Sequence, residues 1–457
     1  MRVYLVTLGC PKNEVISDNM AQLLMEAGHI IVAEPRSADA LLVNTCGFIK
    51  SARLESSQTV LELAERKKDA QKLVVIGCWP QLVGPQILTD FPTVDGLLGV
   101  RRWMEIDRLL TFLDAGVEQK IIWLNDLPDS SLAFRAGRPL RSRPGASAYV
   151  SIADGCSAGC AFCSIPNIKG KLRSRLAADI LDEVRYLVDG GARELILVAQ
   201  DTTAYGLDRG EKDGLPHLLR QIVKNAPELV WLRLMYAYPQ HVTPQLIATM
   251  AEEPKLCHYL DLPLQHAHPQ TLQRMRRPHN VKEIRRTLNA LRTAMPDIAL
   301  RTSFIVGYPG ETEEEFRALL DFVEEVAFDK VGVFMYSREA GTPAYDLPDQ
   351  IPQPMKEERY HRLMQVQQAI SLARNRAQIG CELDVLVEGQ GDGISVGRSY
   401  RDAPEVDGLV IFKGRAPVGE FVRVRVVGAD TYDLTGSWLR RRRTADSYSD
   451  RRPPVKP

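Results

Sequence analysis

Strand-like and helix-like segments alternate from Tyr149 to about Tyr336, which restricts this part of the chain to an α/β fold. A complete eight-unit barrel takes about 250 residues, so this shorter stretch predicts a partial (β/α)6 barrel with an open side. The expected strands are 149–153, 195–199, 230–236, 259–262, 300–306 and 331–336, and the expected helices are 177–189, 215–224, 244–251, 281–293 and 313–325.

A second α/β pattern precedes it and predicts a parallel-sheet domain. Expected strands at 3–8, 40–44 and 72–76 alternate with helices near 17–27 and 51–67. A cysteine follows each strand: Cys10, Cys46 and Cys78. Ligands of open parallel sheets bind beyond the carboxyl ends of the strands, so we expect these thiols to converge. Each cysteine alone could be a small buried apolar residue, but the threefold repetition favours a metal cluster.

Three further cysteines, Cys156, Cys160 and Cys163, follow the first barrel strand with C-x3-C-x2-C spacing. Cysteine thiolates hold iron–sulfur clusters, and three of them leave one iron of a 4Fe–4S cube open to a small molecule. Zinc is an alternative, but a structural zinc site needs four ligands, and no fourth Cys or His lies nearby in sequence. Disulfides do not suit the reducing cytoplasm that we expect in the absence of a secretory signal.

The remaining sequence completes a division into domains. We expect an N-terminal domain at 1–124, a turn-rich linker at 125–148, the barrel with a trailing helix (356–379) at 149–378, a small β-barrel at 379–440 and a basic disordered tail at 441–457. The 457 residues suggest roughly three domains. Formal net charge is zero and no apolar run reaches membrane-spanning length, so we expect a cytoplasmic protein without a membrane partner.

The motif Cys156-x3-Cys160-Ala161-Phe162-Cys163 resembles the signature of radical S-adenosylmethionine (SAM) enzymes. The resemblance implies that the open iron binds SAM and that an electron from the cluster cleaves it to a 5′-deoxyadenosyl radical. The residues expected to contact SAM or substrate lie beside the motif and at strand ends: Phe162, Gln200, Gln265, Arg301, Gly307 and Gly310. His258, His266 and His268 share one segment, but we expect them not to bind metal.

Two three-cysteine sets and a terminal β-barrel together resemble the methylthiotransferase family across nearly the whole chain. This resemblance implies an N-terminal cluster domain, a radical SAM core and an OB-like TRAM domain. It also implies two 4Fe–4S clusters facing one cavity and two SAM molecules, one as methyl donor and one as radical source. A sulfur donor and an electron donor are implied as partners. Cys257 and Cys381 belong to neither set.

The family divides by substrate between an adenosine of transfer RNA and an aspartate of small-subunit ribosomal protein twelve. Five runs resemble the ribosomal-protein branch, RimO: 8–13, 200–206, 261–266, 397–399 and 402–408. From Cys381 to Leu439 ten acidic residues face six basic ones, which suits a basic protein better than RNA; alternatively, these charges only solvate the surface. The predicted substrate is therefore the β-carbon of that aspartate. Transfer RNA modification is the alternative, and a non-catalytic iron–sulfur carrier is a third hypothesis.

The Arg-rich tail leaves direct RNA binding open. It could touch ribosomal RNA or be a dispensable solvated end, and we favour the latter.

Overall fold

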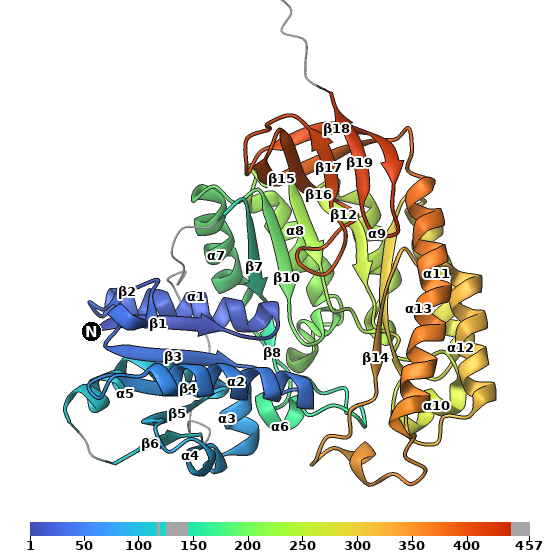
Figure 1. Cartoon of the computed structure of the whole chain (residues 1–457). Helices are drawn as coiled ribbons and strands as arrows, with labels where there is room; N and C mark the ends of the chain where they lie inside the picture. Colours follow the sequence, from blue (N-terminus) through green and yellow to red (C-terminus); the bar gives the residue numbers. More distant parts are fainter. Residues whose placement is uncertain (117–118, 125–144, 440–457) are drawn as a thin grey trace, which may run out of the picture. The chain divides into compact units, whose positions relative to one another are not determined.

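The computed structural model describes residues 1–116, 119–124 and 145–439. The chain forms two compact units, Met1–Ser371 and Leu372–Pro457 (Figure 1). Most of the predicted linker, 125–144, and the whole predicted tail, 441–457, lie outside the described residues.

The first unit begins with a six-stranded sheet in which every strand pair is parallel. Apolar side chains alternate between its two faces. Leu42 packs with the helices at Pro11–Glu26 and Ile106–Asp114, while Leu41 packs on the side of the helix at Lys50–Arg66. The sheet is therefore covered on both sides, as parallel sheets require. In sheet order the strands are β2 (Ile30–Ile31), β1 (Arg2–Thr7), β3 (Ala40–Thr45), β4 (Lys72–Gly77), β5 (Gly96–Gly99) and β6 (Ile121–Trp123).

The first helix of this sheet begins at Pro11, six residues before its predicted start. Proline suits the first helical position, because its missing N–H would have no intrahelical partner there and its φ is already helical. Cys10 is consequently the extended N-cap residue of that helix. The helices are α1 (Pro11–Glu26), α2 (Lys50–Arg66), α3 (Cys78–Val83), α4 (Gln86–Asp90) and α5 (Ile106–Asp114), with 3₁₀ turns at Pro35–Ser37 and Val100–Glu105.

A second six-stranded sheet follows, and all its pairings are parallel too. Its outer strands β7 and β14 do not pair with each other, which confirms the predicted open, partial barrel. In sheet order the strands are β14 (Lys330–Met335), β13 (Ala299–Val306), β12 (Leu256–Asp261), β11 (Trp231–Leu234), β10 (Glu194–Val198) and β7 (Ser147–Ser151). The short strands β8 (Ala153–Asp154) and β9 (Arg173–Ser174) pair antiparallel beside it.

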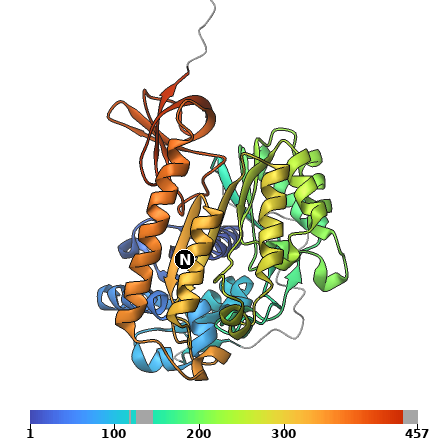
Figure 2. The same ribbon diagram turned by 90° about the vertical axis from the view of Figure 1, so that its right-hand side faces the viewer.

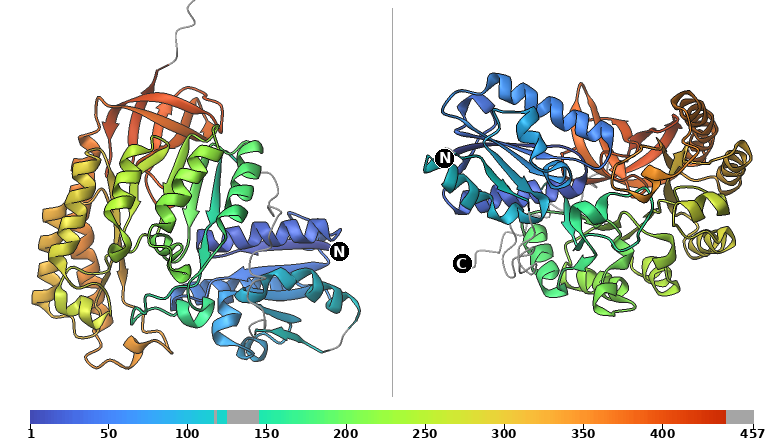
Figure 3. Two further views of the ribbon diagram at one scale, coloured as in Figure 1. Left: turned by 180° about the vertical axis from the view of Figure 1, so that it is seen from behind. Right: turned by 90° about the horizontal axis from the view of Figure 1, so that it is seen from below.

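Helices cover one face of this core sheet, where they bury the largest apolar cluster of the chain (Figure 3). Thr312 and Glu315 form a capping box at the start of α12, which satisfies two free N–H groups of its first turn. The helices are α6 (Ile165–Lys169), α7 (Ala177–Asp189), α8 (Gly214–Asn225), α9 (Pro244–Glu252), α10 (Pro269–Arg274), α11 (Val281–Ala294) and α12 (Glu313–Val326). Four 3₁₀ turns lie at Thr202–Ala204, Leu207–Arg209, Pro239–His241 and Pro343–Asp346.

The long helix α13 (Gln353–Arg376) continues from the core (Figure 2). Gln367 donates from Nε2 to the carbonyl of Phe328 at 3.0 Å, and Ser371 donates from Oγ to the carbonyl of Asp329 at 3.0 Å. These bonds fix α13 to the segment between α12 and β14.

The second unit contains a closed five-stranded barrel, as predicted. Val385, Phe412 and Val424 lie in its apolar interior. Its strands are β15 (Glu382–Gly391), β16 (Ile394–Ser399), β17 (Val410–Lys413), β19 (Leu434–Trp438) and β18 (Phe421–Ala429), in order around the barrel. Among the described residues, none of the helices combines the length and apolarity needed to span a bilayer.

Candidate active site

The N-terminal cysteines lie at the carboxyl ends of three adjacent parallel strands. Cys10 follows β1, Cys46 directly follows β3 and Cys78 directly follows β4 as the first residue of α3. Because β1 pairs with β3 and β3 with β4, all three reach the same sheet edge. We refer to these three cysteines as the N-terminal thiol set.

Two glycines allow the loops that carry this set to approach each other. A Cβ on Gly9, whose φ is +96°, would lie 2.6 Å from the Cβ of Cys46. A Cβ on Gly47 would lie 2.8 Å from the Cα of Trp79, next to Cys78. Asn13 ties the loops further, because its Nδ2 donates to the carbonyls of Leu8 at 2.9 Å and Thr45 at 3.2 Å.

Burial dominates the electrostatics of Cys46 and Cys78 in the N-terminal thiol set. It raises the pKa of Cys78 to about 12, and the neighbouring thiols of Cys10 and Cys46 act in the same direction. The pKa of Cys46 is raised for the same reason, with Cys10 again contributing. A buried thiol becomes a thiolate readily only beside a cation or metal, so this set suits metal coordination better than acid–base chemistry.

Cys156, Cys160 and Cys163, the core thiol set, lie on the loop between β8 and α6. Gly155 makes the entry to this loop possible, since it has φ +71° and a Cβ there would stand 2.1 Å from the carbonyl oxygen of Lys171. The loop is then fastened by the N–H of Cys156, which donates to the carbonyl of Gly170 at 3.0 Å. Burial raises the pKa of Cys163 to about 12 and also raises the pKa of Cys156.

The two thiol sets adjoin. Ser164, next to Cys163, donates from Oγ to the carbonyl of Phe48, two residues after Cys46, at 3.2 Å. Lys169 of α6 is buried, pairs with Asp154 at 2.8 Å and acts electrostatically on Cys78 and Cys10. The Ser164–Phe48 bond links loops that are 116 residues apart in sequence.

Two further contacts join the N-terminal sheet to the core sheet. The Nζ of Lys12 lies 3.5 Å from the ring centroid of Tyr236, a residue held at φ +62° just after β11. Arg53 forms an ion pair with the buried carboxylate of Glu339 at 2.6 Å, and the N–H of Lys50 donates to the same carboxylate at 2.8 Å. The ends of both sheets are thereby held against each other around the cysteines.

Both thiol sets fit an iron–sulfur cluster in the chemistry of their donors. All eight cysteines are free, so the disulfide alternative does not hold. In the described ranges no three His, Cys, Asp or Glu side chains converge on one ion position, as a zinc site requires. A cluster instead presents a separate iron to each thiolate, and each set offers three buried or partly buried cysteines for it.

The residues predicted to contact SAM lie in different environments. Both amide atoms of Gln200 are buried without a hydrogen-bond partner among the described residues. Gln265 stands at φ +72°, and its backbone bridges to β13 through Ser303 and Ile305. Arg301 is ion-paired with the buried Asp261 at 2.7 Å. Gln200 is therefore the member of this group whose polar atoms most need a ligand.

The predicted glycine turn after β13 is packed by protein side chains. Gly307 has φ +70° and a Cβ there would meet Lys356 Cγ at 2.3 Å. Gly310 has φ +71°, and its carbonyl accepts from Arg274 Nη2 at 3.1 Å. Phe162 makes an edge contact with Tyr308 of this turn, with ring centroids 6.5 Å apart. The turn therefore has a structural role, whatever it contacts in addition.

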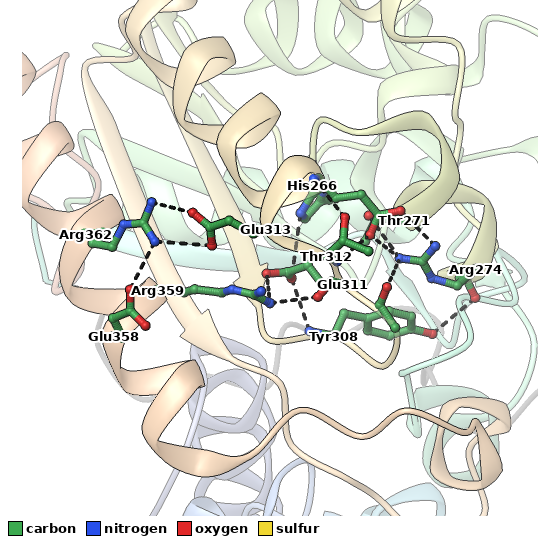
Figure 4. A network of polar contacts seen from close by, with 12 residues as sticks. His266, Thr271, Arg274, Tyr308, Glu311, Thr312, Glu313, Glu358, Arg359 and Arg362 are labelled. Atoms are coloured by element: carbon green, nitrogen blue, oxygen red, sulfur yellow. Dashed lines mark hydrogen bonds and ion pairs between the residues drawn. The ribbon is translucent and has the colours of Figure 1, made fainter.

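Figure 4 shows the polar network that anchors this turn. Buried Glu311 pairs with Arg359 of α13 at 2.9 Å and accepts from the N–H of Tyr308 at 3.2 Å. Arg274 at the end of α10 binds both carboxylate oxygens of Glu315. The network thus joins α10, α12 and α13 at the turn after β13.

The three histidines and two remaining cysteines make other contacts. His266 is fully buried, its Nε2 lies 3.8 Å from Glu311, and burial lowers its pKa to about 3. His268 lies 3.6 Å from Glu315, and His258 lies 2.7 Å from Asp297. Cys257 is buried within β12, and Cys381 is exposed just before β15.

Sequence reasoning missed Lys12, Lys169, Tyr236 and Arg277. One readable signal was overlooked: glycine directly precedes Cys10, Cys78, Cys156 and Cys160, and each of these glycines has positive φ. Glycine at such positions marks backbone that must turn sharply and approach closely.

Three family models match the chain. They are the uncharacterized protein family UPF0004 over residues 2–99, the radical SAM superfamily over 150–323 and the TRAM domain over 379–439. Among solved structures, the radical SAM methyltransferase TsrM from Kitasatospora setae aligns with TM-score 0.56 at 15% identity, covering 81% of this chain and 89% of that one. The cobalamin-dependent radical enzyme OxsB aligns with TM-score 0.52 at 13% identity, covering 81% and 56%. These likenesses show the fold.

Curated relatives match nearly the whole chain. The "ribosomal protein uS12 methylthiotransferase RimO" of Roseiflexus sp. (strain RS-1) is 50% identical, covering 96% of this chain and 97% of the relative. The proteins of the same name from Chloroflexus aurantiacus and Geobacter sulfurreducens are 47% and 45% identical and cover 96% and 95% of this chain, and 100% and 98% of their own. The chain therefore belongs to the RimO family of radical SAM methylthiotransferases.

Proposed function

We propose that this protein replaces a hydrogen on the β-carbon of an aspartate in ribosomal protein uS12 with a methylthio group. The observation that carries the proposal is the contact, through Ser164 and Phe48, between the loops that carry the two thiol sets. Transfer of sulfur to a carbon radical needs the radical source and the sulfur carrier beside one substrate. The RimO relatives, which are named for this reaction on uS12, support the same conclusion.

The cofactors follow from the two thiol sets and the family. A 4Fe–4S cluster on Cys156, Cys160 and Cys163 would supply the electron for SAM cleavage, and one on Cys10, Cys46 and Cys78 would supply the iron that holds sulfur. A second SAM would donate the methyl group, and separate donors would supply electrons and sulfur. The chain's own contribution is to bury the thiols and exclude water from a reactive intermediate.

We assign the binding of SAM first to Gln200. Its two orphaned amide atoms can donate to a carboxylate and accept from an ammonium group, both of which SAM carries. Gln265, Arg301, Phe162, Gly307 and Gly310 remain predictions for the same site.

Lys12 favours an aspartate as the substrate. It lies two residues after Cys10, and its ammonium group rests on the ring of Tyr236 from the core sheet. In the described part of the chain it has no carboxylate partner. An aspartate side chain supplies such a carboxylate. Lys12 thus provides a charge-assisted contact for the substrate beside the N-terminal thiol set.

The barrel of the second unit also favours protein over transfer RNA. Arg398 and Arg401 are buried in it, and Arg423 and Arg425 are paired with acidic residues on its surface. RNA binding depends on cations that neutralise phosphates. Within residues 379–439, only Lys413 and Arg415 remain as exposed cations without an acidic partner. This module is a poor phosphate-binding surface.

Anaerobic incubation of the reconstituted protein tests the proposal. The reaction contains SAM, dithionite, a sulfide source and either a uS12 peptide or unmodified transfer RNA. We expect the peptide to gain the mass of one methylthio group in place of hydrogen, and Cys160→Ala to abolish both this product and 5′-deoxyadenosine. Modified transfer RNA with unmodified peptide would contradict the assignment.

A further inference from the structure

Arg277 is a buried cation beside the core thiol set. Its side chain belongs to the segment after α10 and is 7% exposed. Its Nη1 lies 3.6 Å from the Sγ of Cys160, within the range of a hydrogen bond to sulfur. Its Nη2 donates to the carbonyl of Pro263, and its guanidinium lies 4.3 Å from the ring centroid of Tyr238.

The guanidinium lacks a compensating acid. Across the described ranges no carboxylate pairs with Arg277, and its Nε is buried without a hydrogen-bond partner. A buried charge without a partner is strongly unfavourable. Other buried arginines of the core do have acids: Arg233 pairs with Glu194 at 2.9 Å, and Arg359 pairs with Glu311 at 2.9 Å. Arg277 therefore needs an anion that the polypeptide itself does not provide.

We propose that Arg277 is the built-in counter-charge of the core cluster and raises its reduction potential through the N–H···S contact to Cys160. A cluster held by three thiolates is anionic and becomes more so when it accepts an electron. A fixed cation and a donor to a ligating sulfur both stabilise the reduced form more than the oxidised form. Net charge and hydrogen bonds to sulfur are general determinants of cluster potential. This inference rests on the proposed core cluster and is independent of the substrate.

The fold holds Arg277 in register with Cys160. The N–H of Ala161 donates to the carbonyl of Met275 at 2.9 Å, so each of the two interacting residues lies within two positions of this bond. The ion pair of Arg274 with Glu315 also fixes the end of α10. The guanidinium of Arg277 is consequently held beside the Sγ of Cys160 and has little freedom to move away from it.

The test uses the full-length chain with Cys10, Cys46 and Cys78 replaced by alanine, so that only the core cluster contributes. The variants are Arg277→Met and Arg277→Lys. Arg276→Met is the matched control, because it removes the same charge from the exposed neighbouring residue. Potentials are measured by redox titration with electron paramagnetic resonance, without SAM, and iron per chain is determined for each. Thermal unfolding of the iron-free proteins is measured in parallel.

For Arg277→Met we expect the equilibrium constant for one-electron reduction of the core cluster to fall at least tenfold. This corresponds to a reduction potential more negative by about 59 mV. Arg277→Lys keeps the charge and should show a smaller shift, and Arg276→Met should match the parent. The iron-free Arg277→Met protein should melt no lower than the parent, because an unpaired buried charge has been removed. If the iron-free Arg277→Met protein melts no lower than the parent but does not retain the cluster, this also supports the proposal, because the cluster then depends on the charge of Arg277. An unchanged potential in Arg277→Met, or a lower melting temperature of its iron-free form, would overturn it.

Discussion

Comparing Gly155→Ala with Gly159→Ala separates two effects of adding a Cβ to the core loop: the steric clash and the strain of a left-handed backbone. Both glycines have nearly the same left-handed φ, +71° and +68°. A Cβ at 155 would lie 2.1 Å from the carbonyl oxygen of Lys171, while a Cβ at 159 would meet nothing within 4 Å. The two substitutions therefore differ in space and not in backbone strain.

The magnitude follows from these contacts. Left-handed backbone costs an alanine about 1–2 kcal/mol, and this applies to both variants. At 155 the backbone at Lys171 must also retreat by roughly 1 Å to reach a tolerable contact. That movement strains the bonds from Cys156 N–H to Gly170 and from Leu172 N–H to Ser157 Oγ. Each is worth about 0.5–1.5 kcal/mol, so we expect Gly155→Ala to cost about 2–5 kcal/mol and Gly159→Ala about 1–2 kcal/mol.

The assay is iron per chain after anaerobic reconstitution, together with the denaturation midpoint of the iron-free protein. We expect Gly155→Ala to lose one cluster's share of iron because Cys156 is displaced, and Gly159→Ala to keep both clusters. Equal iron content and equal midpoints in the two variants would refute the reasoning that close approach at Gly155 shapes the core thiol set.

Three further predictions concern the N-terminal thiol set, the substrate and acid stability. Gly9→Ala should lose the N-terminal cluster, because its Cβ would lie 2.6 Å from the Cβ of Cys46. Gly28→Ala is the control and should retain the cluster, because Gly28 has a similar φ of +89° but open space around its Cβ position. Equal iron content in the two variants would contradict the steric role of Gly9. Lys12→Met should raise KM for the uS12 peptide about tenfold or more, because a charge-assisted contact is lost. Lys12→Arg keeps the charge and should have a KM close to that of the parent. An unchanged KM in Lys12→Met would show that Lys12 does not recognise the substrate. Burial lowers the pKa of His266 to about 3, so between its unfolded value near 6.5 and this value the unfolded chain binds a proton that the folded chain does not. The free energy of unfolding therefore falls as pH falls, and this group accounts for a loss of about 2 kcal/mol at pH 5. The iron-free His266→Asn variant should lose correspondingly less stability between pH 7 and pH 5 than the iron-free parent. Equal losses in the two proteins would show that the pKa of His266 is not lowered.

The sequence patterns predict the residues whose role depends on their place in a repeated element. Cys10, Cys46 and Cys78 are such residues, because parallel strands end at one sheet edge whatever their exact register. The boundary of α1 was wrong by six residues, since the helical pattern alone does not reveal that Pro11 occupies the first turn. The very short strands β2 and β6 were missed because two or three residues carry no measurable alternation.

The contacts between elements could not be predicted in this way. Ser164 and Phe48 are separated by 116 residues, and neither has a sequence pattern that points to the other. Arg277 is informative only because it is buried and lacks an acid, which are both tertiary properties. An isolated arginine in a sequence is most often a solvated one. The glycines before four of the six cysteines were the signal within reach of sequence alone.

The central claim is that the N-terminal and core thiol sets carry two clusters beside each other. Electron paramagnetic resonance of the fully loaded, reduced protein tests this most directly. We predict a spectrum broadened by magnetic interaction between the clusters, and loss of that interaction in the Cys10→Ala and Cys160→Ala variants. A spectrum of the loaded protein equal to the sum of the two single-cluster spectra would contradict it.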